Sequence, residues 1–152
     1  MRRLRWLLSD LRRVLSALRR VRAEARRVDR PLVAIACLEG APWAVRGGAN
    51  AYHLRLANEH DRPRAVGVRL RGESDAGALE ASAERVLPAK DAVDLFVVTD
   101  WGARLDVVPE APGEHLALLA PPPFSGECRL TASLVVDGVA VETLTIGQPL
   151  AR

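Results

Sequence analysis

Three histidines and two cysteines are the residues of this 152-residue chain best suited to bind a metal ion or attack a substrate. Zinc sites use such residues at short, regular spacings, for example Cys-x-x-Cys or two histidines four apart on a helix. His53, His60, His115, Cys37 and Cys128 stand at no such spacing. The sequence therefore predicts no metal and no cofactor. We expect solvent-facing histidines and buried free thiols. A disulfide between Cys37 and Cys128 is possible only if the two strands that carry them are neighbours.

Catalytic patterns are equally weak, so the sequence predicts a protein that is not an enzyme and has no catalytic residues. Ser125, in Phe-Ser-Gly, lacks the Gly-x-Ser-x-Gly pattern of a nucleophile elbow. Gly47-Gly48 lacks the Lys-Ser/Thr ending of a phosphate loop, and a sharp turn is expected there. Four aspartates are spread over predicted strands and turns and are expected on the solvated surface: Asp91, Asp94, Asp100 and Asp106.

Charge is distributed unevenly along the chain. Residues 1–30 hold eleven arginines against three acidic residues, a net charge of +8. Residues 31–152 hold eleven basic and sixteen acidic residues, a net charge of −5. A basic arm on an acidic body predicts an anionic partner for the arm.

The most regular pattern is a helical repeat over residues 3–28. Apolar residues recur every three or four positions for more than three heptads, with Arg at most charged positions between them and no Gly or Pro. Pro31 ends the segment, because the residue before a proline disfavours the α conformation. The pattern predicts a long, basic, amphipathic α-helix. Its predicted contact residues are the apolar Leu4, Trp6, Leu7, Leu11, Val14, Leu18 and Val21 and the basic Arg5, Arg12, Arg13, Arg19 and Arg20.

Several surfaces could cover the apolar stripe of this helix. An anionic membrane would receive Leu and Trp at its acyl boundary and Arg at its headgroups. A partner protein would offer a groove, and the chain's own acidic domain could also cover the stripe. Self-association as a coiled coil would place like charges side by side. Nucleic acid would bind the arginines but needs no apolar face. We therefore favour a protein assembly or an anionic membrane over nucleic acid as the partner.

From residue 32 on, apolar residues alternate with polar ones in short runs separated by turn formers, which predicts an antiparallel β-sandwich. Asp137-Gly138 predicts a tight hairpin. Residues 120–126 are expected to be a connection without strand. Trp43 and Trp101 are expected in the core at the ends of the sandwich, with a partner interface as the alternative. The predicted strands are 32–38, 50–57, 64–71, 78–83, 93–99, 104–108, 114–119, 128–136 and 139–146.

One stretch carries a family resemblance. A glycine turn is followed by Asn-x-Tyr-x-Leu-x-Leu-x-Asn, a polar turn and an alternating strand that closes on Gly. The positions are Gly48, Asn50, Tyr52, Leu54, Leu56, Asn58, Val66, Val68, Leu70 and Gly72. Residues 40–72 thus resemble the C-terminal immunoglobulin-like domain of the FixG family of cytochrome c oxidase accessory proteins. The family's transmembrane helices and ferredoxin-like cysteine clusters have no counterpart in this sequence. The resemblance implies an immunoglobulin-like fold and an accessory role beside a membrane complex. It does not imply redox chemistry.

Together these observations predict an all-β immunoglobulin-like antiparallel sandwich at 31–152, preceded by a long basic amphipathic N-terminal α-helix at 1–30. The expected function is that of a non-enzymatic accessory or structural subunit. Its sandwich makes protein contacts, and its helix anchors it to a membrane surface or a larger assembly. The alternative is a nucleic-acid-associated protein with a basic arm. Because charged residues interrupt every apolar run near residue 1, we expect no secretory signal and a cytoplasmic chain, peripheral at the membrane if bound there.

Overall fold

The computed structural model describes residues 14–19, 32–113 and 123–152. The chain divides into two units, Met1–Pro31 and Leu32–Arg152, and each is considered by itself. Within the first unit the described residues 14–19 are helical, and the rest of the helix predicted over 3–28 lies outside the described residues. The strand predicted at 114–119 also lies outside them. No helix in the described part of the chain is long and apolar enough to cross a membrane.

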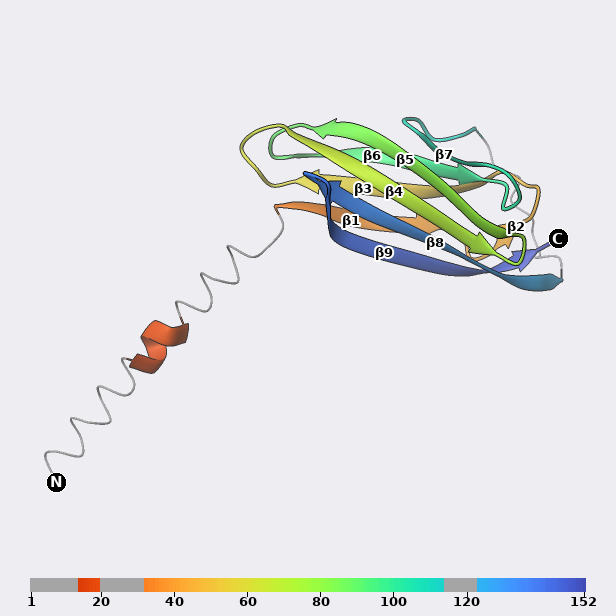
Figure 1. The fold of residues 1–152 in the computed structure, drawn as a ribbon, viewed down its shortest axis with the longest axis horizontal. Helices are drawn as coiled ribbons and strands as arrows, with labels where there is room; N and C mark the ends of the chain where they lie inside the picture. Colours follow the sequence, from red (N-terminus) through yellow and green to blue (C-terminus); the bar gives the residue numbers. More distant parts are fainter. Residues whose placement is uncertain (1–13, 20–31, 114–122) are drawn as a thin grey trace, which may run out of the picture. The chain divides into compact units, whose positions relative to one another are not determined.

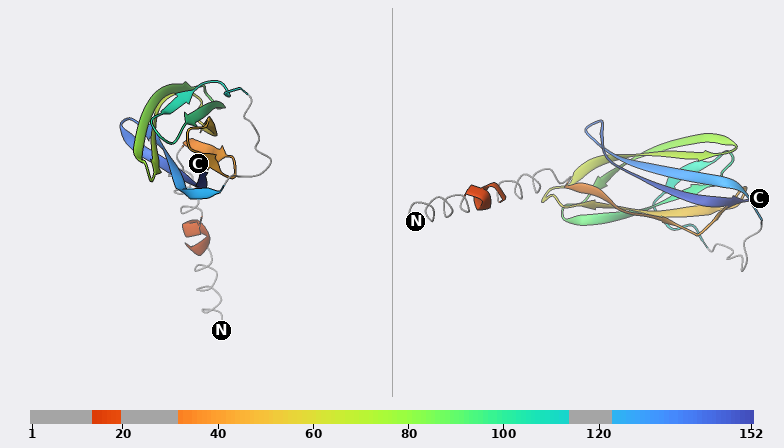
Figure 2. Two further views of the ribbon diagram at one scale, coloured as in Figure 1. Left: turned by 90° about the vertical axis from the view of Figure 1, so that its right-hand side faces the viewer. Right: turned by 90° about the horizontal axis from the view of Figure 1, so that it is seen from below.

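The second unit is a β-sandwich of two sheets (Figure 1). The four-stranded sheet has the order β1-β3-β6-β7 and the five-stranded sheet the order β2-β9-β8-β4-β5. The end-on view in Figure 2 shows the two layers facing each other. The strands are β1 (Val33–Gly40), β2 (Ala44–Val45), β3 (Asn50–Asn58), β4 (Arg64–Ser74), β5 (Gly77–Leu87), β6 (Asp91–Thr99), β7 (Leu105–Val108), β8 (Phe124–Val136) and β9 (Val139–Ala151).

The predicted antiparallel pairing needs one correction. The sequence pattern missed β2, and β2 pairs with the end of β9 in parallel, Ala44 opposite Leu150. A two-residue strand is too short to show period-two alternation, so only its partner reveals it. The predicted connection over 120–126 was wrong in part, because β8 already begins at Phe124, which pairs with Ala151. All other strand pairs in the described residues are antiparallel.

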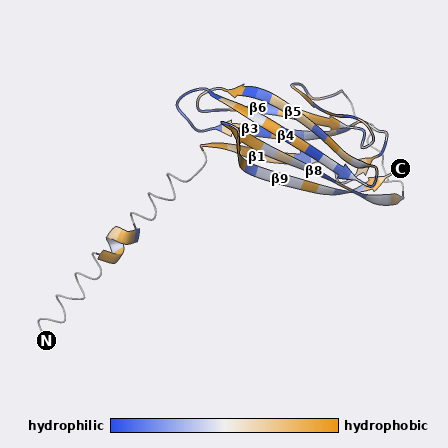
Figure 3. Cartoon of the chain, viewed as in Figure 1, coloured by the Kyte–Doolittle hydropathy of each residue, from blue (hydrophilic) through white to orange (hydrophobic). Residues whose placement is uncertain are grey.

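Alternation along the strands builds the core between the two sheets, and Figure 3 shows the matching change of hydropathy from residue to residue. Every second residue of β3 is buried, beginning at Tyr52, while the residues between them face outward. The core receives, among others, Tyr52, Leu54, Leu56, Val66, Val68, Leu70, Leu95, Val97, Leu130, Ala132 and Leu134. The predicted hairpin is confirmed, since Asp137 and Gly138 both have positive φ, 51° and 79°, as a type I′ turn requires.

A bulge in β1 reverses the faces that its side chains occupy. Ile35 pairs with Leu56 but Cys37 pairs with Arg55, so Ala36 is the extra residue. Before the bulge Ile35 is buried, whereas after it Leu38 packs on the core and Cys37 reaches the outer face only partly covered. The prediction of a buried thiol at Cys37 was therefore wrong. The backbone N–H of Ile35, beside the bulge, donates to Glu142 Oε2 at 2.6 Å.

Cys128 does have the predicted buried position, at 3% exposure, and both cysteines are free thiols. The disulfide left open by the sequence does not form, because the side chain of Cys37 lies on the outer face of its sheet with Glu39 and His53, whereas Cys128 faces the core.

Candidate functional site

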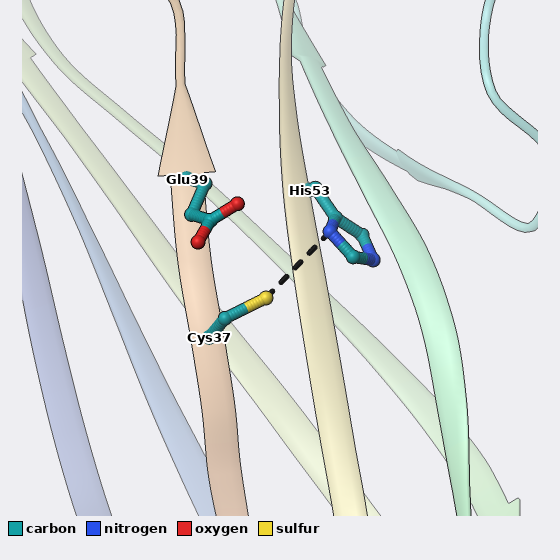
Figure 4. Close-up of side chains that lie close together, drawn as sticks. All are labelled: Cys37, Glu39 and His53. Atoms are coloured by element: carbon teal, nitrogen blue, oxygen red, sulfur yellow. Dashed lines mark hydrogen bonds between the residues drawn. The ribbon is translucent and has the colours of Figure 1, made fainter.

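A cluster of three potential metal ligands lies on the outer face of the four-stranded sheet (Figure 4). Cys37 and Glu39 are on β1, and His53 is on the neighbouring strand β3. Glu39 stands directly opposite His53 in the strand register. Cys37 Sγ lies 3.6 Å from His53 Nδ1, and the ligand atoms of all three residues lie within 4.8 Å of one another. The bulge in β1 brings Cys37 and Glu39 to this face.

The other ring nitrogen of His53, Nε2, is hydrogen-bonded to a carboxylate, and this bond orients the imidazole. Nε2 lies 2.7 Å from Asp94 Oδ1 on β6. An ionised carboxylate only accepts hydrogen bonds, so Nε2 carries a proton, and in the neutral ring Nδ1 then presents its lone pair toward Cys37. The imidazole also stacks on Phe96, with ring centroids 5.4 Å apart and planes inclined by 22°. The ring is thus held by a hydrogen bond at its edge and by an aromatic face.

Asp94 is kept ionised by its neighbours. The hydrogen bond from His53, and then the nearby charge of Arg55, lower the pKa of this carboxyl below its usual value. Arg55 Nη1 lies 3.1 Å from both carboxylate oxygens. Asp94 is on the solvated surface, as predicted, but it is paired with two side chains of β3 that the sequence did not connect to it.

Two kinds of chemistry fit these groups. Sulfur, nitrogen and carboxylate oxygen together make a ligand set for zinc. Cys37, His53 and Asp94 also follow the order of a nucleophile, its base and an orienting acid. Nucleophilic catalysis further needs a concave substrate site and donors for a developing oxyanion. Two hollows in the described surface lie elsewhere, one beside Leu32 and Lys90 and the other beside residues 147–149, and neither is lined by the cluster. The arrangement favours metal binding.

The sequence did not reveal this cluster, because its members are neighbours across two strands and not along one. Cys-x-Glu places two side chains on one strand face, and that was the available signal. Reading it required the register of β1 against β3, and also the bulge. Strict alternation from Val33 and Ile35 would have sent Cys37 and Glu39 into the core.

The other residues weighed from sequence are not brought together. Ser125 is exposed on β8, and His60 is in the turn after β3, where its backbone N–H donates to Asn58 Oδ1. Asp100 accepts hydrogen bonds from the backbone of its own loop. Gly47 has a φ of 75°, as a sharp turn requires. His115 lies outside the described residues.

Only three of the twelve predicted contact residues of the N-terminal helix are described. Val14 and Leu18 are 57% and 53% exposed, Leu15 beside them is 49% exposed, and Arg19 is also exposed. The other nine lie outside the described residues: Leu4, Arg5, Trp6, Leu7, Leu11, Arg12, Arg13, Arg20 and Val21.

Comparison with known proteins adds information on the fold. No protein-family model and no curated protein matches the chain. Among solved structures, the chain is similar to a CARDB domain from Pyrococcus furiosus that was solved in complex with di-metal ions. The TM-score is 0.50 and the identity 12%, over 75% of this chain and 88% of that one. A putative β-galactosidase from Bacteroides fragilis matches with a TM-score of 0.45 and 13% identity, over 80% of this chain and only 16% of that one. At 12% identity the likeness to the CARDB domain is one of fold alone, and it agrees with the two-sheet sandwich described above.

Proposed function

We propose that the chain is a non-enzymatic accessory subunit whose sandwich makes protein contacts and whose basic N-terminal segment holds it on an anionic membrane surface. One observation carries the proposal. Leu18 follows Leu15 by three residues and Val14 by four, which places it beside both on one face of the helix, and all three are about half exposed. They belong to a segment with a net charge of +8.

The energetics favour lipid as the occupant. Covering a leucine is worth about 1.5–3 kcal/mol, so a long apolar stripe is rarely left bare. Each Arg near an anionic bilayer adds on the order of 1 kcal/mol. The remainder of the chain has a net charge of −5 and would be repelled by the same surface. The charge asymmetry therefore orients the chain, with the segment on the membrane and the sandwich directed toward other proteins.

The sandwich offers surfaces for such contacts. Val86 lies on β5, which ends the five-stranded sheet, and is 65% exposed. Val139, beside the β8–β9 hairpin, is also 65% exposed, and Phe124 at the start of β8 is 49% exposed. Exposed aromatic and branched side chains and open strand edges are common elements of protein interfaces. The resemblance to the FixG family supports an accessory role of this kind beside a membrane complex.

Sedimentation with lipid vesicles tests the anchor. We expect the full chain to sediment with anionic vesicles but not with zwitterionic ones, and to be released by salt. Deleting residues 1–30 should abolish sedimentation. Leu18→Asp should weaken it much more than Ala17→Asp, which adds the same charge beside the stripe.

Three outcomes would contradict the membrane proposal. One is sedimentation that survives the deletion. A second is salt-resistant capture of a protein that is lost in Leu18→Asp, which would identify a groove partner. The third is tight nucleic-acid binding with a steep salt dependence that tolerates Leu18→Asp, which would identify a basic arm.

A further inference from the structure

We infer that Cys37, Glu39 and His53 form a zinc site that joins β1 to β3 on the outer face of the four-stranded sheet. This reverses the expectation from sequence spacing. It is independent of the anchoring role of the N-terminal segment, because every residue that carries it lies in the sandwich.

The distance between the two soft ligands fits a tetrahedral ion. Zinc binds Cys sulfur at about 2.3 Å and His nitrogen at about 2.0–2.1 Å, and a tetrahedral angle then separates these atoms by about 3.5 Å. Cys37 Sγ and His53 Nδ1 are 3.6 Å apart. The carboxylate of Glu39 completes a set of ligand atoms within 4.8 Å, and its exposed side chain is free to rotate about its own bonds. Little movement is needed to close all three ligands on one ion.

The backbone under the site is well defined. Glu39 and His53 face each other in register, and Cys37 is two residues back along the same strand face. Sites on paired strands hold their ligands more accurately than sites on loops. The bulge at Ala36 is what sets this arrangement, because it turns Cys37 and Glu39 outward while Leu38 keeps its place against the core.

His53 has the outer partner that metal-binding histidines usually have. Such histidines donate their second ring N–H to a carboxylate or carbonyl, which fixes the tautomer and raises the basicity of the ligating nitrogen. Asp94 is that acceptor for Nε2, at 2.7 Å. Phe96 holds the plane of the ring from one side. The orientation of the ring and of Nδ1 is therefore already suited to binding a cation in the metal-free protein.

The charges balance as well. A thiolate on Cys37 and a carboxylate on Glu39 neutralise the two positive charges of Zn²⁺, and His53 is neutral. Arg55 and Asp94 neutralise each other beside the site. Binding replaces the thiol proton of Cys37 with the ion, and that proton is released to solvent. Three protein ligands leave a fourth position, which water or a side chain from another molecule can fill.

Without zinc the same atoms make a thiol–imidazole hydrogen bond, so the experiment must separate the two states. The full chain, reduced and free of metal, is titrated with Zn²⁺ by calorimetry and with Co²⁺ by absorption. We expect one ion per chain and a thiolate-to-cobalt charge-transfer band. Cys37→Ser and His53→Gln should abolish both. Asp94→Asn, which keeps all three ligands, should weaken binding by about 10–100-fold.

Matched controls keep the test interpretable. His60→Gln removes a histidine outside the cluster and is the control for His53→Gln. Glu84→Gln removes an exposed carboxylate on β5 and is the control for Glu39→Gln. Both controls should bind zinc like the wild type, and thermal unfolding of each metal-free variant checks that it is folded. The inference is overturned if the wild-type chain binds no stoichiometric zinc, if folded Cys37→Ser binds as tightly as the wild type, or if bound cobalt shows no thiolate band.

Discussion

Trp101 meets Tyr52 edge to face in the core, with ring centroids 6.2 Å apart and planes at 89°. Trp101 Nε1 donates a hydrogen bond to Tyr52 Oη at 3.2 Å, and Tyr52 Oη donates to Gln148 Oε1. Gln148 Nε2 then donates to the carbonyl of Ala41. Burial raises the pKa of Tyr52 well above its usual value, so the hydroxyl keeps its proton and its place as a donor. This buried chain links β3 to β9, one strand from each sheet.

Removing the hydroxyl tests the chain of hydrogen bonds. Tyr52→Phe keeps the ring but leaves Trp101 Nε1 without its acceptor, and leaves Gln148 Oε1 with only the long contact from the Cys128 thiol, at 4.0 Å. Each unsatisfied buried group costs about 1–3 kcal/mol, so the free energy of unfolding should fall by at least that amount in chemical denaturation. Thr131→Val removes a hydroxyl whose hydrogen bond, to Thr145, is exposed, and should cost less than about 0.5 kcal/mol. Equal losses for the two variants would contradict this account.

Gly40 provides the space that the Tyr52 ring occupies. A Cβ at residue 40 would lie 2.6 Å from Cδ1 and 2.7 Å from Cε1 of Tyr52. Gly40→Ala must therefore displace a ring that is 1% exposed, and we expect a cost of about 1–3 kcal/mol in unfolding experiments, as for other overpacked cores. Gly126→Ala adds the same methyl group where nothing lies within 4 Å. The prediction is wrong if the midpoint temperatures of the two variants fall equally.

Asp100 should make stability depend on pH in the acid range. Its Oδ1 accepts from the backbone N–H groups of residues 102, 103 and 104, each at 2.9 Å. These bonds lower the pKa of Asp100 from 3.8 to about 2. A lowered pKa adds stability that is present above pH 3.8 and is lost as the pH falls through about 2.

The variant Asp100→Asn isolates this effect. Asparagine keeps an acceptor oxygen but does not titrate, so its difference in unfolding free energy from the wild type should shrink as the pH falls from about 4 to 2. Asp100→Ala, which removes the acceptor, should be less stable than the wild type at neutral pH. A difference between wild type and Asp100→Asn that stays constant over this window would refute the assignment.

Glu142 should hold the bulge in β1. Its carboxylate accepts from the N–H of Ile35 at 2.6 Å, a hydrogen bond to a charged group. Glu142→Ala leaves that N–H without its acceptor, and we expect a loss of about 1–3 kcal/mol in denaturation experiments. It should also weaken zinc binding, because the bulge sets the positions of Cys37 and Glu39. Glu127→Ala removes an exposed glutamate of β8 and should change neither property.

The two thiols should differ in reactivity toward a disulfide reagent. Cys128 is 3% exposed, and burial raises its pKa to about 11, so little thiolate forms at neutral pH. Cys37 is partly exposed on the sheet surface. One thiol per folded chain should react quickly and the second only after unfolding, and Cys37→Ser should remove the fast phase. Protection of the fast thiol by zinc would support the metal site independently.

Local patterns were enough for much of the fold, since they depend on neighbours in the chain. The alternation over residues 50–58 predicted β3 and its buried face, because side chains of a strand point alternately to opposite sides. Asp137-Gly138 predicted a hairpin because few residues accept two successive positive φ angles. The residues that carry the FixG resemblance have a structural role here. Tyr52, Leu54 and Leu56 fill the core, and the side chain of Asn58 ties down the loops at residues 62 and 87–88.

By itself, then, the sequence determined the sandwich class, the position of its clearest strands and turns, and a basic segment followed by an acidic remainder. Only the tertiary structure decided what Cys37, Glu39 and His53 do together. Their meeting depends on which strands pair, in which register, and on one extra residue in β1 that inverts the inward and outward faces. A shift of one residue moves every later side chain to the opposite face of a strand. No local sequence pattern near Ala36 indicates that β1 contains such a shift.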